Sequence, residues 1–539
     1  MTIELDRDFL SDEEEDGNNS RPGTASGDGV PKKGDPVAVA VRLRPPVRIG
    51  IGERFQSSDP NRQLEVSRFK PVRRLLANRK LQFLLILPNQ IVFWTVIFVG
   101  LFGTVVPGLN FGAAITWYVW FCLVFVMMVV VGRAWCSMCP FGGFGEWIQR
   151  RTFWKRTQKA LGLGKKLPEP IARYGFIIPV VSFLILTWIE EFFNIAGPGN
   201  PADTAWMVVG IVSFALLFFL VFERRTFCRY FCPLTSLIGT VGSMGSVAGF
   251  RTKDRDVCLS CQTKDCMRGN SKGFGCPWYT WPGSADSNLY CGLCTECYKT
   301  CPEGNVGLFV QKPLTSVVQP SRRRADVAWA IALLWGLVLF QQINSTNVYA
   351  SLDNWLNKKM SFAHYPNPID YTVIIGVLAL ITAGIVLLLA NALAKKDVNF
   401  VQSGDFVDKK SKFRAFFLPM MYGLIPIVGA DYFARQLPKF FKHSARLVPS
   451  VGHFFGVGGG MNSSIYSFHI INNSWIVVVQ VAIIALGTLG SLWAMWRISG
   501  RDLIPVSKNA VSLRLATTSL VVICGLAASI LYVAMHAAS

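Results

Sequence analysis

Long apolar runs separated by short polar segments extend over most of the chain. Each run has about 18–25 residues, enough for a helix that rises 1.5 Å per residue to cross about 30 Å of hydrocarbon. We place nine runs, at residues 82–106, 113–132, 172–193, 204–222, 325–342, 371–394, 413–431, 474–496 and 514–535. The pattern predicts an all-α polytopic membrane protein with about nine transmembrane helices.

The polar segments divide the chain into four parts. Residues 1–78 are acidic at first and then basic, and we expect them to form a disordered, basic cytoplasmic tail. Residues 79–235 hold four runs and residues 325–539 hold five, so we expect a four-helix membrane domain and a five-helix C-terminal membrane domain. Residues 236–324 between them are polar and rich in cysteine, and we expect a small inserted domain there.

Composition and charge agree with this division. Hydrophobic residues make up 51% of the chain and charged residues only 16%, whereas soluble proteins carry about 25% charged residues. The net charge is +21, but the basic residues flank the apolar runs, so we expect membrane lipid and not nucleic acid as the partner. With the N-terminus inside, the outer loops hold six of the 54 Lys and Arg residues, namely Lys358, Lys359, Arg435, Lys439, Lys442 and Arg446. We therefore expect a bacterial-type inner membrane protein whose N-terminus and inserted domain are cytoplasmic and whose C-terminus is outside.

Twelve of the fourteen cysteines stand in short-spaced groups, and the strongest group lies in the inserted domain. Cys291-x2-Cys294-x2-Cys297-x3-Cys301-Pro302 has the spacing of a bacterial ferredoxin motif. A second run of three cysteines followed by Cys-Pro precedes it, with longer gaps. In two-cluster ferredoxins the fourth cysteine of each run binds the other cluster. We predict two [4Fe–4S] clusters in a ferredoxin-like domain, with zinc as the alternative: one on Cys258, Cys261, Cys266 and Cys301, and one on Cys291, Cys294, Cys297 and Cys276.

Four further cysteines follow two of the apolar runs at matched positions. Cys136 and Cys139-Pro140 follow the second run, and Cys228 and Cys232-Pro233 follow the fourth. The two Cys-Pro pairs are 93 residues apart, which indicates an internal repeat of a helix hairpin. We predict one further redox site on these four thiols. A third cluster, a copper ion, redox dithiols and inert buried cysteines all remain open.

Other polar residues are weaker candidates. Glu190 and Glu191 stand at the outer end of the third run, where a carboxylate could accept protons from a quinol. His453 and His469 lie in an outer loop, and we regard haem as an unlikely cofactor because loop histidines are common. The chain has no Walker loop, no dinucleotide-binding glycine fingerprint in a strand–helix context and no hydrolase triad signature.

The order of these motifs resembles the membrane polyferredoxin family of NapH, NosR and CcoG (RdxA/FixG). The resemblance covers about residues 80–325 and rests on Gly132-Arg133-x-Trp135-Cys136-x2-Cys139-Pro140, on Cys228-x3-Cys232-Pro233 and on the two ferredoxin motifs. It implies a membrane-bound iron–sulfur protein that moves electrons between a quinol pool and a protein redox partner or respiratory complex, as a subunit of a quinol dehydrogenase-type oxidoreductase. The resemblance to the assembly factors of this family implies an alternative, in which the four membrane cysteines bind or reduce copper for a respiratory enzyme.

Overall fold

Helices dominate the structure, a computed structural model that describes residues 63–154, 161–195, 200–319, 323–360, 368–396, 409–457, 460–503 and 510–537. Eight helical segments among these residues are long and apolar enough to cross a membrane. They are Leu81–Phe102, Phe111–Val131, Pro201–Val221, Ala325–Ile343, Thr372–Leu393, Phe416–Phe454, Asn473–Leu503 and Val511–Met535. The chain is therefore a multi-pass helical membrane protein, and this confirms the predicted fold class.

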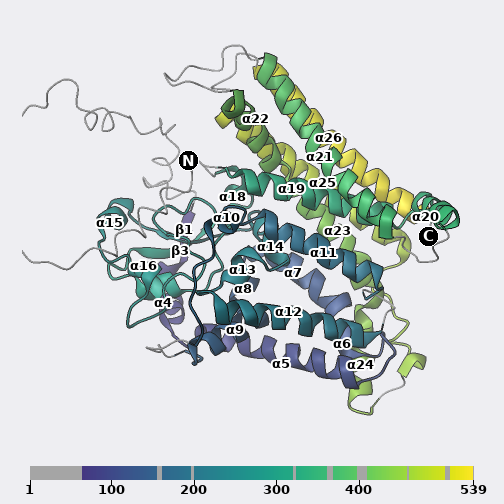
Figure 1. Ribbon diagram of the computed structural model, residues 1–539, viewed down its shortest axis with the longest axis horizontal. Coiled ribbons are helices and arrows are strands. Elements are labelled where there is room, and N and C mark those ends of the chain that lie inside the picture. The colour runs from purple at the N-terminus through teal and green to yellow at the C-terminus, as the bar shows by residue number, and fades with distance from the viewer. Residues whose placement is uncertain are drawn as a thin grey trace, which may run out of the picture.

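The first half of the chain forms a helical bundle that adjoins the sheet-bearing end of the molecule (Figure 1). Its long helices are α5 (Leu81–Phe102), α6 (Phe111–Ala113) continued by η2 (Ala114–Trp120) and α7 (Phe121–Val131), α11 (Ile177–Phe192) and α12 (Pro201–Val221). The shorter ones are α8 (Trp135–Met138), α9 (Pro140–Arg150), α10 (Glu169–Ala172), α13 (Thr226–Tyr230) and α14 (Leu234–Gly242). Helix α9 packs against both α5 and α12.

Two glycines allow this close packing of α9. A Cβ atom at Gly143 would lie 2.5 Å from Ile86 of α5, and one at Gly145 would lie 2.2 Å from Phe219 of α12. Non-bonded carbon atoms do not approach each other this closely, so neither position accepts a larger residue unless the helices move.

The third predicted span differs from the prediction in length. Residues 172–193 form α11, which has 16 residues and is about 24 Å long at 1.5 Å per residue. It is shorter than the eight segments above because residues before Ile177 form turns and the short helix α10. Helix α11 still packs against α14 and α19.

The second half is built around two buried helices, α19 (Ala325–Ile343) and α23 (Ile425–His443). The helices around them are α20 (Asn347–Met360), α21 (Pro368–Lys396), α22 (Lys409–Gly423), α24 (Leu447–Phe454), α25 (Asn473–Ile498) and α26 (Ala510–Ala537), with the short η3 (Ser444–Arg446), η4 (Gly460–Asn462) and η5 (Ser499–Leu503). Helix α23 packs against α25 and α19 and also against α7, so it joins the two halves.

The seventh predicted span, 413–431, is not a single helix. Helix α22 ends at Gly423 and α23 begins at Ile425, and Pro426 occupies the first turn of α23, where a missing N–H group is tolerated. Because α23 continues to His443, Arg435, Lys439 and Lys442 lie on this helix and not in an outer loop as expected.

A three-stranded antiparallel sheet stands at one end of the helices (Figure 1). Its order is β1 (Gln63–Glu65), β3 (Val306–Gln311), β2 (Val247–Thr252). The short helices around it are η1 (Val66–Arg68), α4 (Lys70–Ala77), α15 (Arg255–Ser260), α16 (Asp265–Arg268), α17 (Glu296–Thr300) and α18 (Thr315–Val318).

Residues 63–77 therefore differ from the disordered tail expected for residues 1–78. Strand β1 pairs with β3 in the register Leu64↔Val310, and the hydroxyl of Ser67 accepts a hydrogen bond from the amide of Leu308 at 3.2 Å. The backbone groups at the edge of β3 gain partners in this way. Residues 1–62 lie outside the described residues.

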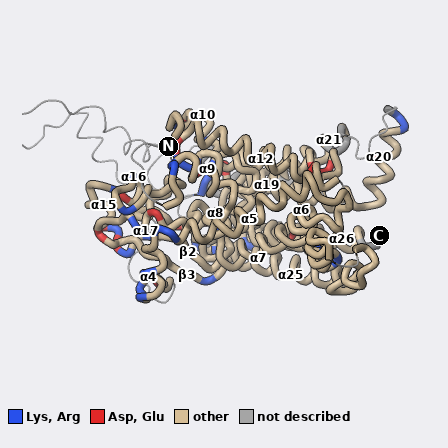
Figure 2. The backbone as a smooth tube through the Cα atoms, turned by 90° about the horizontal axis from the view of Figure 1, so that it is seen from below, with Lys and Arg blue, Asp and Glu red and all other residues tan. Residues whose placement is uncertain are grey.

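Charged residues gather at the end that carries the sheet. Figure 2 shows Lys, Arg, Asp and Glu concentrated around α4, α15 and α17, while the tubes of α5, α12 and α19 are almost free of them. This distribution separates a water-facing end from the apolar helices.

Candidate metal centres

The first predicted set of cysteines lines one cavity. Cys258 lies on α15 and Cys261 directly follows it, Cys266 lies on α16, and Cys301 follows α17. The side chains of all four line a cavity together with Trp281, Pro302 and Asn305. The fold thus brings together four thiols that are separated by up to 43 residues in the sequence.

Polar hydrogens point at the sulfur atoms of this first set. The side-chain amide of Asn305 donates to Cys258 Sγ at 3.3 Å, and its backbone N–H donates to Cys301 Sγ at 3.3 Å. Hydrogen bonds to sulfur are one of the means by which a protein sets the reduction potential of an iron–sulfur cluster. The sequence analysis did not identify Asn305, and its position four residues after Cys301 is the one signal that could have pointed to it.

The second set also converges. Burial raises the pKa of the Cys297 thiol well above its usual value, and the nearby thiols of Cys276, Cys294 and Cys291 raise it further. Burial likewise raises the pKa of Cys276, while the amides of Thr280 and Trp278 lower it. Thiols gathered in this way lose their protons when a metal binds, so the donor set fits a metal centre with thiolate ligands.

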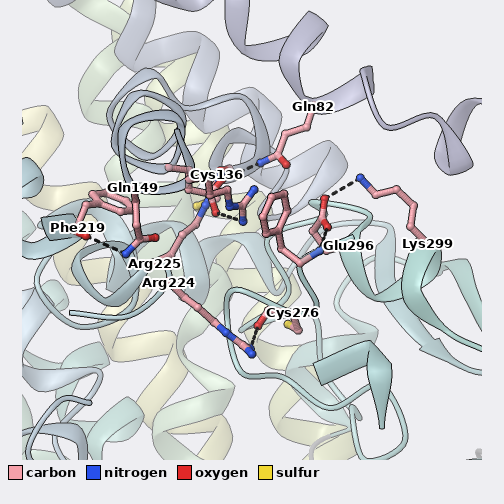
Figure 3. Close-up of polar contacts among 12 residues, drawn as sticks. Gln82, Cys136, Gln149, Phe219, Arg224, Arg225, Cys276, Glu296 and Lys299 are labelled. Carbon is pink, nitrogen blue, oxygen red and sulfur yellow. Dashed lines mark hydrogen bonds and ion pairs between the residues drawn. The ribbon is translucent and has the colours of Figure 1, made fainter. Parts of the chain in front are cut away.

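A buried ion pair fixes the geometry of the second set. Glu296 and Lys299 of α17 lie 2.7 Å apart with side chains 4% and 5% exposed, and Glu296 also accepts a hydrogen bond from the amide of Phe274 at 2.8 Å (Figure 3). This contact ties the helix that carries Cys297 to the segment that leads to Cys276.

The two sets are neighbours. The amide of Cys276 donates to the carbonyl oxygen of Cys266 at 2.8 Å. Burial raises the pKa of Cys266 to about 12, and thiols of both sets, Cys301 first, contribute to the increase. One-electron carriers placed at the two sets would therefore be close together.

One glycine is required at the second set. Gly249 of β2 has a φ of +91°, which side-chain-bearing residues rarely adopt, and a Cβ there would lie 3.0 Å from Cys291 Sγ. It marks a register shift between β2 and β3.

The four remaining grouped cysteines meet at the junction of the helical bundle and the cysteine-rich segment. Burial raises the pKa of Cys228 well above its usual value; Arg225 lowers it, and Cys232, Cys139 and Cys136 raise it. A Cβ at Gly142, which follows the first pair, would lie 3.3 Å from Cys228 Sγ of the second pair. The structure thus brings both pairs to one place, but whether they bind a cluster stays a prediction.

The two pairs have similar local structure. Cys139 is the N-cap residue of α9; burial raises the pKa of its thiol to about 12, while the nearby amide of Gly142 lowers it. Cys232 precedes α14; burial raises the pKa of its thiol to about 11, while the nearby amide of Leu234 lowers it. Helix N-termini favour thiolates because the free amides and the helix dipole stabilise negative charge.

Buried arginines connect these pairs to the second set, as Figure 3 shows. Arg225 donates to the carbonyl oxygen of Cys136 at 2.5 Å and to Glu146 at 2.8 Å. Arg224 donates to the carbonyl oxygen of Cys276 at 2.8 Å. Arg225 lies close enough to lower the pKa of Cys228, whereas Arg224 contacts the backbone of the second set.

Trp278 lies between the second set and the four membrane-end thiols. It is 3% exposed and belongs to the same buried cluster as Cys276, Cys294, Cys136 and Cys228. The guanidinium carbons of Arg133 and Arg225 lie 4.3 Å and 6.0 Å from its ring centre. Its ring therefore packs in the same buried cluster as cysteines of both sets.

Within the described residues, no group of three or more His, Cys, Asp or Glu side chains is arranged to hold a single metal ion. A single ion needs ligands that converge on one point, whereas in a cube each thiolate binds its own iron atom.

The other candidates lie apart from these centres. Glu190 and Glu191 stand at the far end of α11, about 20 Å along the helix from Ile177. Cys122 and Cys524 are single cysteines on α7 and α26. His453 and His469 are exposed, and His364 lies outside the described residues.

Comparison with known proteins finds similarity in the first half of the chain. Residues 113–159 and 204–249 each match a family described as a 4Fe-4S binding domain. The two matches contain the pairs Cys136/Cys139 and Cys228/Cys232, and they agree with the internal repeat that the spacing predicts. An uncharacterized protein of Methanocaldococcus jannaschii is 25% identical over 190 residues, which are 33% of this chain and 73% of that protein. No solved structure matches the chain. The chain thus contains 4Fe-4S binding sequences within a membrane protein.

Proposed function

We propose that this protein transfers electrons between a membrane-soluble carrier, a quinol, and a protein redox partner through three [4Fe–4S] clusters. The first is bound by Cys258, Cys261, Cys266 and Cys301, and the second by Cys291, Cys294, Cys297 and Cys276. The third is bound by Cys136, Cys139, Cys228 and Cys232. Such clusters carry one electron each.

The observation that carries this proposal is the unbroken succession of the three thiol sets. The first set adjoins the second at the Cys276–Cys266 hydrogen bond of 2.8 Å. The second adjoins the third at Arg225, which lies within electrostatic range of both Cys228 and Cys294. Clusters at these positions would form a line from the water-facing end to the membrane helices.

A polar cavity beside the third set supports a carrier site there. Arg133, Arg229 and Arg324 line it together with the aromatic rings of Trp278 and Tyr290. The Tyr290 hydroxyl and Arg133 Nε are buried and have no hydrogen-bond partner within the described chain. Guanidinium and phenol donors can hydrogen-bond the oxygens of a quinone head group, but the cavity, with a free volume of about 20 Å³, does not enclose the ring, which would have to lie at its entrance. Glu190 and Glu191 stay a prediction for proton transfer at the opposite end of α11.

The proposed orientation places the cysteine-rich segment in the cytoplasm. Charged residues gather at that end in Figure 2, and α20 and α24 lie at the opposite end of the helices in Figure 1. If α11 crosses the membrane together with the eight longer segments, the chain crosses nine times and its C-terminus lies outside.

The copper-handling alternative assigns the same four membrane-end cysteines to a single copper ion. The family match over both cysteine pairs favours a cluster, because the matched domain is described as 4Fe-4S binding. Both readings predict metal at these residues, and metal analysis distinguishes them.

Anaerobic purification in detergent followed by electron paramagnetic resonance tests the proposed function. We expect cluster signals after reduction with dithionite and also after addition of a short-chain quinol, or reoxidation of the reduced clusters by the quinone. Copper or zinc without acid-labile sulfide would contradict the proposal. Clusters that respond to dithionite but to neither form of the carrier would contradict the quinol assignment alone.

A further inference from the structure

A fully buried carboxyl group lies inside the C-terminal helices, away from the cysteines. Asp431 on α23 has no exposed surface. Its Oδ1 atom accepts a hydrogen bond from the Tyr532 hydroxyl of α26 at 2.9 Å and another from Nε2 of Gln342 on α19. Ionisable residues within membrane-spanning segments are costly and are found mainly at functional sites.

Two unpaired oxygens indicate the protonation state of this carboxyl group. Asp431 Oδ2 and Gln342 Oε1 are both buried and, within the described chain, neither has a hydrogen-bond partner. The carboxyl group and the amide already share one hydrogen bond, from Gln342 Nε2 to Asp431 Oδ1. One proton on Oδ2 would let the carboxylic acid donate to Oε1, so that both unpaired atoms gain a partner at once. An ionised carboxylate would leave two buried acceptors unpaired.

The nearest cation on the same helix is engaged elsewhere. Arg435, one turn after Asp431, donates to the carbonyl oxygen of Gln341 at 2.7 Å and to Glu191 at 3.5 Å. Among the described residues, no ion pair involves Asp431. Without an ion-pair partner, a buried carboxyl group is more stable in its neutral form.

Charged side chains continue from Asp431 along one face of α23. Asp431, Arg435 and Lys439 are spaced four residues apart, so they lie on one face over about 12 Å. Glu191 contacts Arg435, and Glu190 and Glu191 lie within electrostatic range of Lys439. This line connects the buried carboxyl group to the His443 end of α23.

We propose that Asp431 is an intramembrane proton-binding site, in which a carboxylic acid paired with the Gln342 amide exchanges its proton with the carboxylates of Glu191 and Glu190, which Arg435 and Lys439 hold beside this face of α23. The ligand is a proton, and no electron is transferred at this site. The proposal does not depend on the clusters, because none of these groups contacts the cysteine sets, although it shares Glu190 and Glu191 with the proton transfer predicted above.

Infrared spectroscopy of the full chain in nanodiscs tests the protonation state. We expect a carboxylic acid C=O band that is absent in Asp431→Asn, shifted in Tyr532→Phe and unchanged in the control Asp326→Asn. Asp326 is a suitable control because its carboxylate is paired with the Arg324 guanidinium at 2.6 Å and not with an amide. Asparagine offers the same donor and acceptor pattern as the acid, so Asp431→Asn should fold. A band that both Asp431→Asn and Tyr532→Phe leave unchanged would overturn the proposal.

The exchange path is tested by the rate at which this band shifts after transfer into D2O. We expect Arg435→Gln to slow the shift by about tenfold or more, and the control Arg446→Gln, whose side chain contacts Tyr466 instead, to leave the rate unchanged. Equal rates in the wild type and Arg435→Gln would overturn the assignment of the path while leaving the proton-binding site in place.

Discussion

Arg225 and Glu146 form an ion pair from which water is almost fully excluded, with side chains 1% and 2% exposed. Burying two charges costs several kcal/mol each, so such a pair seldom adds net stability compared with apolar residues. The position of the pair offers a different explanation for its presence. Glu146 retains the Arg225 guanidinium between Cys228 and Cys294, where it would offset the negative charge of two thiolate-bound clusters.

Loss of Glu146 should destabilise the protein strongly. We expect Glu146→Gln to lower the free energy of unfolding by about 3–5 kcal/mol, because it leaves Arg225 buried without its charge partner. The exposed pair Glu169–Arg173, 3.8 Å apart, provides the control, and Glu169→Gln should change stability by less than about 1 kcal/mol. Thermal unfolding in detergent measures both; equal stabilities would show that the buried pair is not needed.

The effect of Glu146 should also depend on pH. Burial alone raises its pKa, but Arg150 and Arg225 together hold it below 4.5. A carboxyl whose pKa is lowered by folding contributes stability above its unfolded value, and this contribution disappears as the pH falls through the folded value. The stability difference between wild type and Glu146→Gln should therefore be full at neutral pH and shrink below pH 4.5. A difference that grows on acidification would refute this.

Asn305 should set the reduction potential of the first cluster. Its side-chain amide donates to Cys258 Sγ at 3.3 Å, and hydrogen bonds to sulfur stabilise the more negative, reduced state. A loss of about 1 kcal/mol corresponds to a potential lower by about 40 mV for one electron, and we expect a shift of this size in Asn305→Ala. Asn270, whose side chain binds Asp265 and Thr300 and no sulfur, is the control in a redox titration. Equal shifts in both variants would argue against a role for this hydrogen bond.

Sequence reasoning was most effective for residues whose chemistry depends on spacing. The ferredoxin cysteines and both Cys-Pro pairs were recognisable because several thiols recur at fixed intervals. Glu146, Asn305 and Asp431 were not, because each is a single polar residue whose partners come from distant parts of the chain. Their roles depend on burial, which one sequence does not reveal.

At the scale of elements, α9 determines how the two cysteine pairs meet. It begins at Pro140, directly after Cys139, and fits between α5 and α12 through glycines on its surface. A larger residue at this contact would displace the start of the helix and the thiol in front of it.

We therefore expect Gly145→Ala to destabilise the protein by about 1–3 kcal/mol through overpacking against Phe219, which a new Cβ would approach to 2.2 Å. Gly210→Ala on α12 has no neighbour within 4 Å and serves as the matched control. Thermal unfolding and iron content report on both variants. If Gly145→Ala is as stable as Gly210→Ala, α9 does not pack as described.

Hydropathy predicted most helices because a membrane span must be long and apolar. It failed where local chemistry or distant pairing decides the element. The break between α22 and α23 follows from Pro426. The polar residues of α23 were predicted to lie in a loop, because the local sequence does not show that other helices bury them. Strand β1 forms only because β3, about 240 residues later, offers its edge.

At the scale of the whole molecule, the water-facing end and the end with α20 and α24 should lie on opposite sides of the membrane. Limited proteolysis of sealed vesicles tests this. We expect cleavage within residues 253–304 in inside-out vesicles and protection in right-side-out vesicles. The reverse pattern would invert the topology and place the clusters outside the cell.

The third cluster is the central claim, because it would join the membrane helices to the two ferredoxin-type sites. The most direct test is a count of iron and acid-labile sulfide in the anaerobically purified wild type and in the double variant Cys139→Ser/Cys232→Ser. Three cubes predict about twelve irons per chain, falling to about eight in the variant with the signals of the two other clusters intact. An unchanged iron content, or a loss of copper in place of iron, would contradict the account.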